Sequence, residues 1–460
     1  MVFSSITFIY YFLPIVLFLY FIVPKKYRNL VLLISSLLFY FYGEQKYILL
    51  LVGSSIFNYF FGKLISKSKK KKLYLVIGLL VNFLVLVYFK YMDFFIENFN
   101  NIFNISLSYL NLIIPLGISF YTFQATSYLI DVYNKKIEYE NNFIDFCTYL
   151  VMFPHLTAGP IVRYSTIKNE LKNQSISYSN FSLGVYRFAT GLFKKVMISD
   201  LLSSYVTTLT SLNAPSILSY WLIAIMNTLI IYFDFSGYSD MAIGLGKMFG
   251  FTFLENFNYP LTANSITEFW RRWHISLSSW FRDYIYIPMG GNRVKKIRWY
   301  FNIFVVWMTT GLWHGASWNF VMWGLYFAIL LVFEKAFILK FLNKHKILGI
   351  ISTNLLVIIS FVIFNNSNLS DIGVFLSSMF GLNNLPLVNS EVLFYLRNYG
   401  ITIILAGVLA SPIISNWFNK IKNKYKIMTL IEPLIYVVIL LMVTAFILDE
   451  SFNPFLYFRF

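Results

Sequence analysis

Cysteine and charge are both scarce in this chain of 460 residues, and each shortage excludes a class of protein. Cys147 is the only cysteine, which excludes a disulfide framework, a thiolate metal cluster and an internal redox pair. Charged residues make up 12% of the chain and hydrophobic residues 58%, whereas soluble domains carry roughly a quarter charged residues. We therefore expect a membrane protein.

Strict alternation of apolar and polar residues, the signature of membrane β-strands, is also missing from the long apolar runs. These runs instead approach the ~20 residues that a helix needs to cross the hydrocarbon core. Lipid leaves a spanning chain only helices or closed barrels, because every backbone polar group must find a partner. We expect an all-α polytopic membrane protein with about 11 transmembrane helices, together with re-entrant or interfacial helices.

The distribution of basic residues predicts how the chain is oriented. Lysine and arginine total 37 against 20 aspartates and glutamates, and they cluster at the ends of apolar runs, as in residues 63–72. Such clusters are typical of cytoplasmic loops and suit contact with anionic lipid headgroups, which argues against a nucleic-acid partner. The first run, residues 6–23, lacks a preceding basic region and a following cleavage site, so we expect a retained helix. Both termini are then expected outside the cytoplasm.

Two segments in the middle of the chain do not fit simple crossings. Residues 143–162 are apolar but interrupted by two prolines and by His155. A broken helix at membrane depth is tolerated only where it lines a cavity or packs against protein. Residues 184–206 carry Lys194 and Lys195 at their centre, so we expect an interfacial or re-entrant helix from which the two lysines snorkel.

His314 is the first candidate for chemistry, because it lies in residues 309–319, an otherwise apolar and helical-looking stretch. A charged side chain at membrane depth costs at least a few kcal/mol, so an ionisable residue there marks a candidate site. Imidazole titrates near neutrality and can take a proton from a hydroxyl. Gly311 and Gly315 flank it and are expected to leave room for a substrate. A structural histidine bonded to a neighbouring carbonyl stays open as the alternative.

His274 is the second candidate. Trp273, Leu277 and Trp280 recur at helical spacing, which predicts one aromatic stripe on a continuous helix. His274 and Trp270 would lie one turn apart on an adjoining face. An interfacial amphipathic helix with a tryptophan belt would produce the same pattern, so the spacing alone does not establish a catalytic role.

Four stretches together resemble the membrane-bound O-acyltransferase superfamily, and within it the bacterial branch of alginate O-acetyltransferases and the teichoic-acid D-alanyl transfer protein. They are residues 152–163, 233–242, 270–280 and 311–316. The resemblance covers nearly the whole chain and implies many helices that ring a thinned core with broken helices and a tunnel. It also implies that His314 is the catalytic histidine and His274 the second polar residue of the site.

Several further residues in or beside these stretches are candidates for supporting or lining the site. The carboxylates are expected to orient ring nitrogens or helix ends, although buried carboxylates are more often paired than catalytic. No metal site and no bound cofactor are expected. The supporting candidates are Asp234, Asp240, Glu268, Trp313 and His155.

An acyl thioester is already activated, so its transfer needs a base for the incoming hydroxyl and stabilisation of the oxyanion. Our hypothesis makes His314 the base, while His274 orients the donor or stabilises the tetrahedral intermediate. The donor, with acetyl-CoA favoured, is expected on the cytoplasmic side and the acceptor polysaccharide outside. Tyr457 belongs to an aromatic tail that resembles the ending of the alginate branch. This residue is a candidate acyl relay, and the alternative is a structural plug.

The predicted function is O-acetylation of a cell-surface polysaccharide by a multi-pass protein of the bacterial cell membrane. The resemblance implies an extracytoplasmic, hydrolase-like acetyltransferase as partner. Two alternatives stay open: a teichoic-acid D-alanyl transfer protein served by a small acyl carrier protein, and a non-enzymatic acyl or polysaccharide exporter. We expect one membrane domain over residues 1–460, divided into N-terminal helices (1–140), catalytic core (141–340), C-terminal helices (341–448) and extracytoplasmic aromatic tail (449–460).

Overall fold

The computed structural model describes residues 1–174 and 176–449, and the relay candidate Tyr457 lies outside this range. The described residues form helices and no strands, which confirms the predicted all-α class. They divide into two compact units. The first unit comprises Met1–Phe188 and Tyr238–Glu255, and the second comprises Ala189–Gly237 and Asn256–Asp449.

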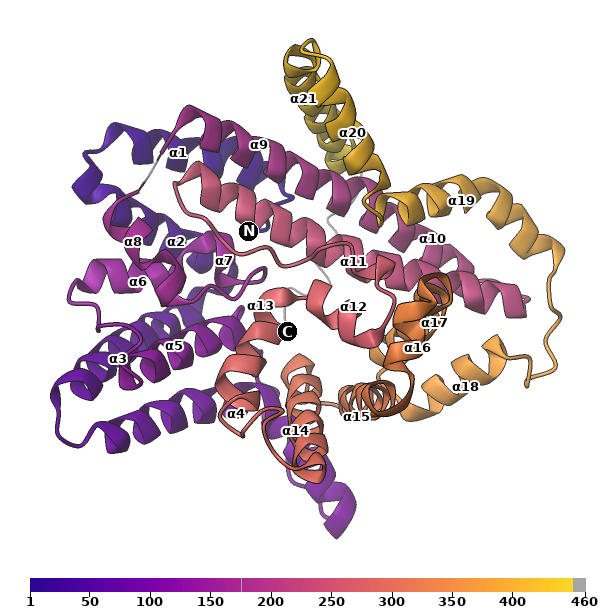
Figure 1. Cartoon of the computed structure of the whole chain (residues 1–460), viewed down its shortest axis with the longest axis horizontal. Coiled ribbons are helices and arrows are strands. Elements are labelled where there is room, and N and C mark those ends of the chain that lie inside the picture. The colour runs from indigo at the N-terminus through magenta and orange to yellow at the C-terminus, as the bar shows by residue number, and fades with distance from the viewer. Residues whose placement is uncertain (175, 450–460) are drawn as a thin grey trace. The chain divides into compact units, whose positions relative to one another are not determined.

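The first unit holds the N-terminal helices (Figure 1). The apolar runs form helices because lipid offers the backbone no other hydrogen-bond partners. Helices α3, α4 and α5 pack against one another. The predicted interruption of residues 143–162 is present as a break between α6 and the short α7. The helices are η1 (Thr7–Phe12), α1 (Leu13–Ile22), α2 (Arg28–Glu44), α3 (Ile48–Lys67), α4 (Lys71–Phe103), α5 (Ile118–Tyr133), α6 (Phe143–Val151), α7 (Phe153–Leu156) and α8 (Tyr164–Lys172).

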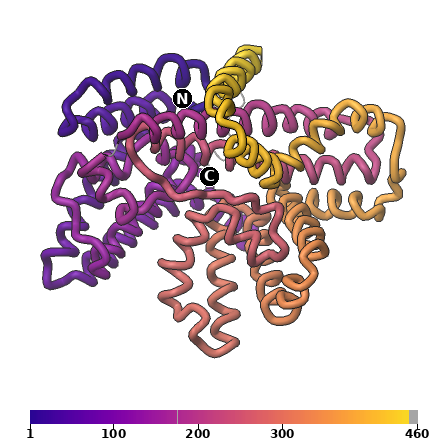
Figure 2. The backbone as a smooth tube through the Cα atoms, turned by 45° about the horizontal axis from the view of Figure 1, so that its top comes forward, coloured from indigo at the N-terminus to yellow at the C-terminus, as the bar shows by residue number. Residues whose placement is uncertain are grey.

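The second unit holds both candidate histidines: His274 lies between α12 and α13, and His314 is the last residue of α14. Helix α14 packs against α15. It also contacts the π-helix η6, and these two elements run antiparallel in Figure 2. Helices α9 (Tyr178–Phe193) and α11 (Ile217–Met248) contribute residues to both units. The other principal helices are η4 (Lys194–Asp200), α10 (Leu201–Thr210), α12 (Ile266–Arg272), α13 (Ile275–Phe281), η6 (Arg282–Tyr286), α14 (Lys296–His314), α15 (Trp318–Phe333), η7 (Glu334–Ile338), α17 (Lys346–Asn365), α18 (Leu369–Met379), α19 (Ser390–Leu409), α20 (Ile413–Lys424) and α21 (Met428–Asp449).

Six helical segments among the described residues are long and apolar enough to cross a membrane. Shorter apolar helices accompany them, as expected of a polytopic membrane protein. The predicted number of about 11 crossings is larger than six because it also counts shorter or more polar segments, such as α14 and α15, as crossings. The six segments are Lys25–Lys67, Lys71–Phe103, Ile217–Met248, Lys346–Asn365, Ser390–Leu409 and Met428–Asp449.

The prediction that Lys194 and Lys195 snorkel to the interface is wrong for Lys195. The side chain of Lys195 is 2% exposed, and its Nζ lies 2.8 Å from Asp200 Oδ1 and 2.7 Å from Asp234 Oδ1. A buried ammonium is tolerated when carboxylates compensate its charge. The ion pairs tie η4 to α11, so this lysine contributes to the packing of the second unit.

The predicted continuous helix around His274 is also wrong. Helix α12 ends at Arg272 and α13 begins at Ile275, so the aromatic stripe of Trp273, Leu277 and Trp280 is divided between a loop and a helix. His274 has a φ of +44°, in the left-handed region that residues with a Cβ rarely adopt. The break therefore places His274 on a sharp turn instead of on a helix face.

Candidate functional site

His314 lies at the end of a helix rather than inside a continuous span. It is the last residue of α14, and Gly315 after it has extended backbone. Ser317 precedes α15, so the chain reverses within three residues. The His314 side chain is buried in this turn, with 4% of its surface exposed. The turn holds the imidazole between two packed helices.

The prediction that Gly311 and Gly315 leave room for a substrate is wrong, because α15 already fills that space. A Cβ at Gly311 would lie 2.3 Å from the carbonyl oxygen of Phe320 and 3.1 Å from the Cα of Gly324. A Cβ at Gly315 would lie 2.1 Å from the Phe320 ring. Glycine is used here because it lets two backbones approach closely. These residues position His314 by helix packing.

Aromatic rings surround the His314 imidazole. Ring centroids lie 4.9 Å away in Trp313, 5.0 Å away in Trp323 and 5.2 Å away in Phe364, and all three rings are steeply inclined to the imidazole. Such a shell excludes water and strengthens electrostatic interactions inside it. His314 therefore occupies an apolar environment in which its imidazole interacts more strongly with a bound polar group than it would in water.

His274 is held by Asn256, a residue that the sequence analysis did not single out. The Asn256 Oδ1 atom accepts the backbone N–H of Ser276 at 3.2 Å and the Ser276 hydroxyl at 2.8 Å. It also lies 3.1 Å from His274 Nδ1. A backbone N–H can only donate, so this atom of Asn256 is an acceptor. His274 Nδ1 must then carry the proton and donate to it.

This hydrogen bond determines what the other nitrogen of His274 can do. In a neutral imidazole protonated at Nδ1, Nε2 carries a lone pair and accepts. Burial lowers the pKa of His274 to about 3, so the ring is neutral at physiological pH. Nε2 is buried and has no hydrogen-bond partner among the described residues. It is thus available to accept a hydrogen bond or a proton from a bound molecule.

Trp313 connects the two histidines. Its ring centroid lies 5.9 Å from that of His274 and 4.9 Å from that of His314. The second unit therefore places the rings of His274, Trp313 and His314 side by side. Trp323, which also packs on His314, was missed because nothing in its local pattern distinguishes it from other aromatic residues of α15.

An aromatic box continues from His314 toward α12. We use this name for Trp270, Trp307, Trp323 and Phe327. Trp270 lies 4.6 Å from Trp307, 5.5 Å from Trp323 and 4.9 Å from Phe327 between ring centroids. Aromatic rings inclined in this way pack favourably through edge-to-face contacts. The box makes a continuous apolar wall from α12 to α15.

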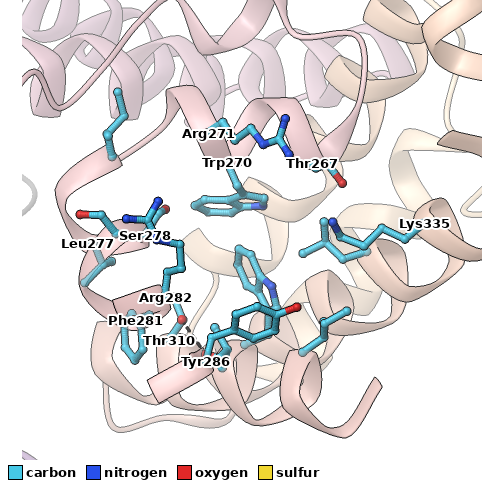
Figure 3. Close-up of a pocket in the computed structure, with 16 residues that line it drawn as sticks. Thr267, Trp270, Arg271, Leu277, Ser278, Phe281, Arg282, Tyr286, Thr310 and Lys335 are labelled. Atoms are coloured by element: carbon cyan, nitrogen blue, oxygen red, sulfur yellow. Dashed lines mark hydrogen bonds between the residues drawn. The ribbon is translucent and has the colours of Figure 1, made fainter. Parts of the chain in front are cut away.

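A pocket of about 460 Å³ opens beside the aromatic box. Its wall includes Ile275, the neighbour of His274, and Thr310, one turn before His314. Arg271, Arg282 and Lys335 enter its wall from three sides, as Figure 3 shows. None of the described lining residues is acidic. This cationic pocket therefore suits an anionic molecule that extends along an aromatic surface.

The start of α12 is fixed by three hydrogen bonds from its backbone N–H groups to two side chains. The Ser265 side chain accepts the backbone N–H of Glu268 at 3.1 Å, a helix cap. The Glu334 carboxylate accepts the backbone N–H groups of Ile266 and Thr267 at 2.6 and 2.9 Å. A carboxylate at a helix N-terminus also complements the helix dipole. Glu334 thereby joins α12 to the end of α15 and supports the cationic pocket.

The three candidate carboxylates have structural partners. Asp234 pairs with Lys195 as described above, and Asp240 pairs with Arg187 through a hydrogen bond of 2.8 Å in the first unit. Glu268 pairs with Arg272 at 2.5 Å and accepts the backbone N–H of residue 264 at 2.9 Å. These contacts hold helices and helix ends in place.

His155 belongs to the first unit, whereas His274 and His314 belong to the second. It lies on α7 and is fully buried, with Nδ1 3.0 Å from Gln124 Nε2. Its ring also packs edge-on against Phe253. His155 therefore has a defined structural environment inside its own unit.

The site thus consists of a buried pair of histidines beside a cationic pocket, in a chain whose described residues are all-helical. The profile of the membrane-bound O-acyltransferase family matches residues 135–370, and the chain belongs to this family. It is therefore a multi-pass membrane protein and an acyltransferase.

Several relatives are named for O-acetylation. A probable alginate O-acetylase of Pseudomonas aeruginosa is 41% identical over 80% of this chain and 73% of its own length. A probable alginate O-acetylase of Pseudomonas putida is 37% identical, with both chains covered completely. A peptidoglycan O-acetyltransferase of Helicobacter pylori is 36% identical over 77% of this chain and 75% of its own length.

Proposed function

We propose that this protein transfers an acetyl group from a cytoplasmic thioester donor across the membrane for O-acetylation of a cell-surface polysaccharide. The observation that carries the proposal is the enclosed pair of histidines beside a cationic pocket. The relatives named for O-acetylation of alginate and peptidoglycan support the acyl group and the class of acceptor.

In this mechanism His314 is the general base. It removes the proton of an incoming hydroxyl as the hydroxyl oxygen bonds to the thioester carbonyl carbon. The carbonyl π electrons move to oxygen and form a tetrahedral oxyanion. When the intermediate collapses, the C–S bond breaks and the thiolate leaves with the bonding pair, taking up the proton held by His314. No covalent bond to the histidine is required.

His274 acts as an acceptor in this proposal. Its Nδ1–H is engaged by Asn256, so its Nε2 lone pair can orient a hydroxyl or an amide N–H of the bound donor. A neutral acceptor repels an oxyanion instead of stabilising it. This argument favours the orienting role among the two roles predicted for His274, and it assigns oxyanion stabilisation to other groups.

The donor in this proposal is an anionic acyl thioester, with acetyl-CoA favoured. Coenzyme A carries phosphates at one end and the thioester at the other, joined by a long neutral arm. The cationic pocket offers Arg271 and Lys335 for the phosphates and extends toward Ile275 and Thr310, beside the two histidines. The absence of acidic residues among its described lining residues further favours an anion.

An acceptor for the acetyl group is needed on the outer side. Tyr457 lies outside the described residues and remains our candidate relay, because a phenol oxygen can take an acetyl group and release it to a second acceptor. An extracytoplasmic, hydrolase-like acetyltransferase would then complete delivery to the polysaccharide. Under this proposal the tail acts covalently, whereas a structural plug would tolerate loss of the phenol.

The decisive experiment measures acetate released by mild base from cell-surface polysaccharide in a deletion strain. The strain is complemented with wild type, His314→Ala or Tyr457→Phe, at matched protein levels. We expect wild type alone to restore acetate, because one variant lacks the base and the other lacks the relay oxygen. Full restoration of acetate by His314→Ala would rule out His314 as the general base. Restoration of acetate by Tyr457→Phe would show that the tail acts as a structural plug and not as a relay.

The same samples discriminate the two alternative functions. Release of D-alanine instead of acetate would favour a teichoic-acid D-alanyl transfer protein served by an acyl carrier protein. A non-enzymatic exporter should survive loss of His314, since transport needs no base at that position. The relatives named for O-acetylation align with more than three quarters of the chain, which makes acetate the expected product.

A further inference from the structure

One buried indole ring packs on His314 and a second packs on the first, and neither indole N–H bonds to an acceptor among the described residues. They belong to Trp270 and Trp323, which are 7% and 1% exposed. Leaving a buried donor without an acceptor costs about 1–3 kcal/mol, so such groups are rare in native structures and need an explanation. A bound molecule that carries an acceptor supplies one.

Only one of the two indoles lines the cationic pocket. Trp270 is a lining residue, and its ring lies across the upper part of the pocket in Figure 3, with the nitrogen on the side of Lys335. Trp323 packs between Trp270 and His314, at 5.5 and 5.0 Å between ring centroids. A molecule in the pocket therefore meets the Trp270 N–H one ring away from the imidazole of His314.

We propose that the indole N–H of Trp270 donates a hydrogen bond to the thioester carbonyl oxygen of the acyl donor and stabilises the oxyanion formed from it. This inference rests on the proposed acyl transfer. The N–H keeps its proton throughout, because indole is a donor only. The bond strengthens as the carbonyl π electrons move to oxygen, and it weakens again when the C–S bond breaks. Trp270 thus acts on the transition state more than on the bound donor.

The surroundings of Trp270 favour a carbonyl over a phosphate as its partner. Trp307 and Phe327 pack against the ring at 4.6 and 4.9 Å, so aromatic groups enclose the ring itself, and Lys335 lies on the side of its nitrogen. A fully charged phosphate would lose its hydration there at high cost. A neutral carbonyl enters without that cost and becomes charged only during reaction. The phosphates are better served by Arg271 and Lys335 in the same pocket.

Neither histidine is assigned the role of donating a hydrogen bond to the oxyanion. His274 presents a lone pair at Nε2, because Asn256 holds the proton on Nδ1, and His314 acts as the base. A preorganised, neutral donor inside a dry aromatic wall meets the requirement for oxyanion stabilisation. Trp270 is accordingly a catalytic residue under this proposal, and its ring also contributes to packing.

The test replaces the Trp270 N–H without removing its ring. Trp270 is changed to 3-benzothienylalanine, which keeps the fused rings and places sulfur where the N–H was, and separately to Phe. Inverted membrane vesicles from the cells' own membrane, which hold the full-length protein together with its acetyl acceptor, receive acetyl-CoA, and thiol release gives kcat and KM. The 3-benzothienylalanine variant should lose about 10²–10³-fold in kcat, the loss typical of one oxyanion donor, with KM little changed.

The matched control is Trp221→Phe. Trp221 donates its indole N–H to the carbonyl oxygen of Met379 at 2.9 Å and does not line the cationic pocket, so its kcat should equal that of wild type. A Trp270 analogue with wild-type kcat, or one that raises only KM, overturns the inference. If vesicles holding the His314→Ala variant release thiol as fast as wild-type vesicles do, the proposed function itself fails.

Discussion

At the scale of single residues, a hydrogen bond decides what His274 can do. Asn256 accepts from His274 Nδ1 and from the backbone and side chain of Ser276, so its orientation is held by three donors. His274 also has a left-handed backbone, which costs about 1–3 kcal/mol for such a residue and persists only where the surroundings enforce it. Both features keep the Nε2 lone pair in one position.

Asn256→Ala should therefore lower kcat by roughly 100-fold while the protein stays folded, because the His274 ring loses its orienting acceptor and can adopt the other tautomer. The measurement is thiol release from acetyl-CoA by inverted membrane vesicles. Asn258→Ala is the matched control, since Asn258 is exposed and uses only its backbone N–H, toward the Arg272 carbonyl. Equal kcat in both variants would show that Asn256 does not position His274.

At the scale of elements, the hairpin of α14 and α15 depends on glycines where the helices cross. Gly311 faces the Phe320 carbonyl and Gly324, and Gly324 in turn faces the Trp307 carbonyl, at 2.6 Å from a Cβ built on it. These contacts leave no space for a methyl group. The crossing also places Trp323 against His314, the last residue of α14. The packing of the two helices therefore determines the geometry of the site.

Gly311→Ala should destabilise the protein by about 1–3 kcal/mol and lower activity, since a new Cβ forces the two helices apart. Gly407→Ala in α19 is the control. No atom lies within 4 Å of a Cβ at Gly407, so that change should stabilise the helix by roughly 0.5–1 kcal/mol. Thermal unfolding of the purified proteins in detergent tests both. Comparable transition temperatures for Gly311→Ala and wild type would contradict the close packing.

At the scale of the whole molecule, charge determines how the chain is oriented in the membrane. Lys70 lies in the lysine-rich turn between α3 and α4, and Asn104 lies at the far end of α4, a helix long enough to cross the bilayer. The potential of the cytoplasmic leaflet attracts the lysines and keeps them inside. Lys70 is therefore expected on the cytoplasmic side and Asn104 outside.

Cysteine labelling tests this orientation in living cells. Cys147 is buried, so a Cys147→Ala background removes the only native thiol without placing a new polar group in the interior. Lys70→Cys and Asn104→Cys are both at exposed positions. A membrane-impermeant maleimide should label Asn104→Cys in intact cells and Lys70→Cys only after permeabilisation. The reverse pattern would invert the topology and place the thioester donor's entry on the other side.

The chain's composition and the lengths of its apolar runs were sufficient to predict an all-α membrane protein, because lipid leaves the backbone no other way to complete its hydrogen bonds. His314 could be identified in the sequence for a similar reason, since an ionisable residue stands out in an apolar stretch. The break in residues 143–162 was also predictable from its prolines.

Tertiary structure alone decided how these parts act together. Asn256 and His274 are 18 residues apart with no periodicity linking them. The burial of Lys195 depends on carboxylates from two elements, and the space beside Gly311 and Gly315 depends on where Phe320 falls. Local patterns report which face of a helix is apolar. Partners distant in sequence are selected by packing, and packing determines which donors and acceptors are satisfied before a substrate arrives.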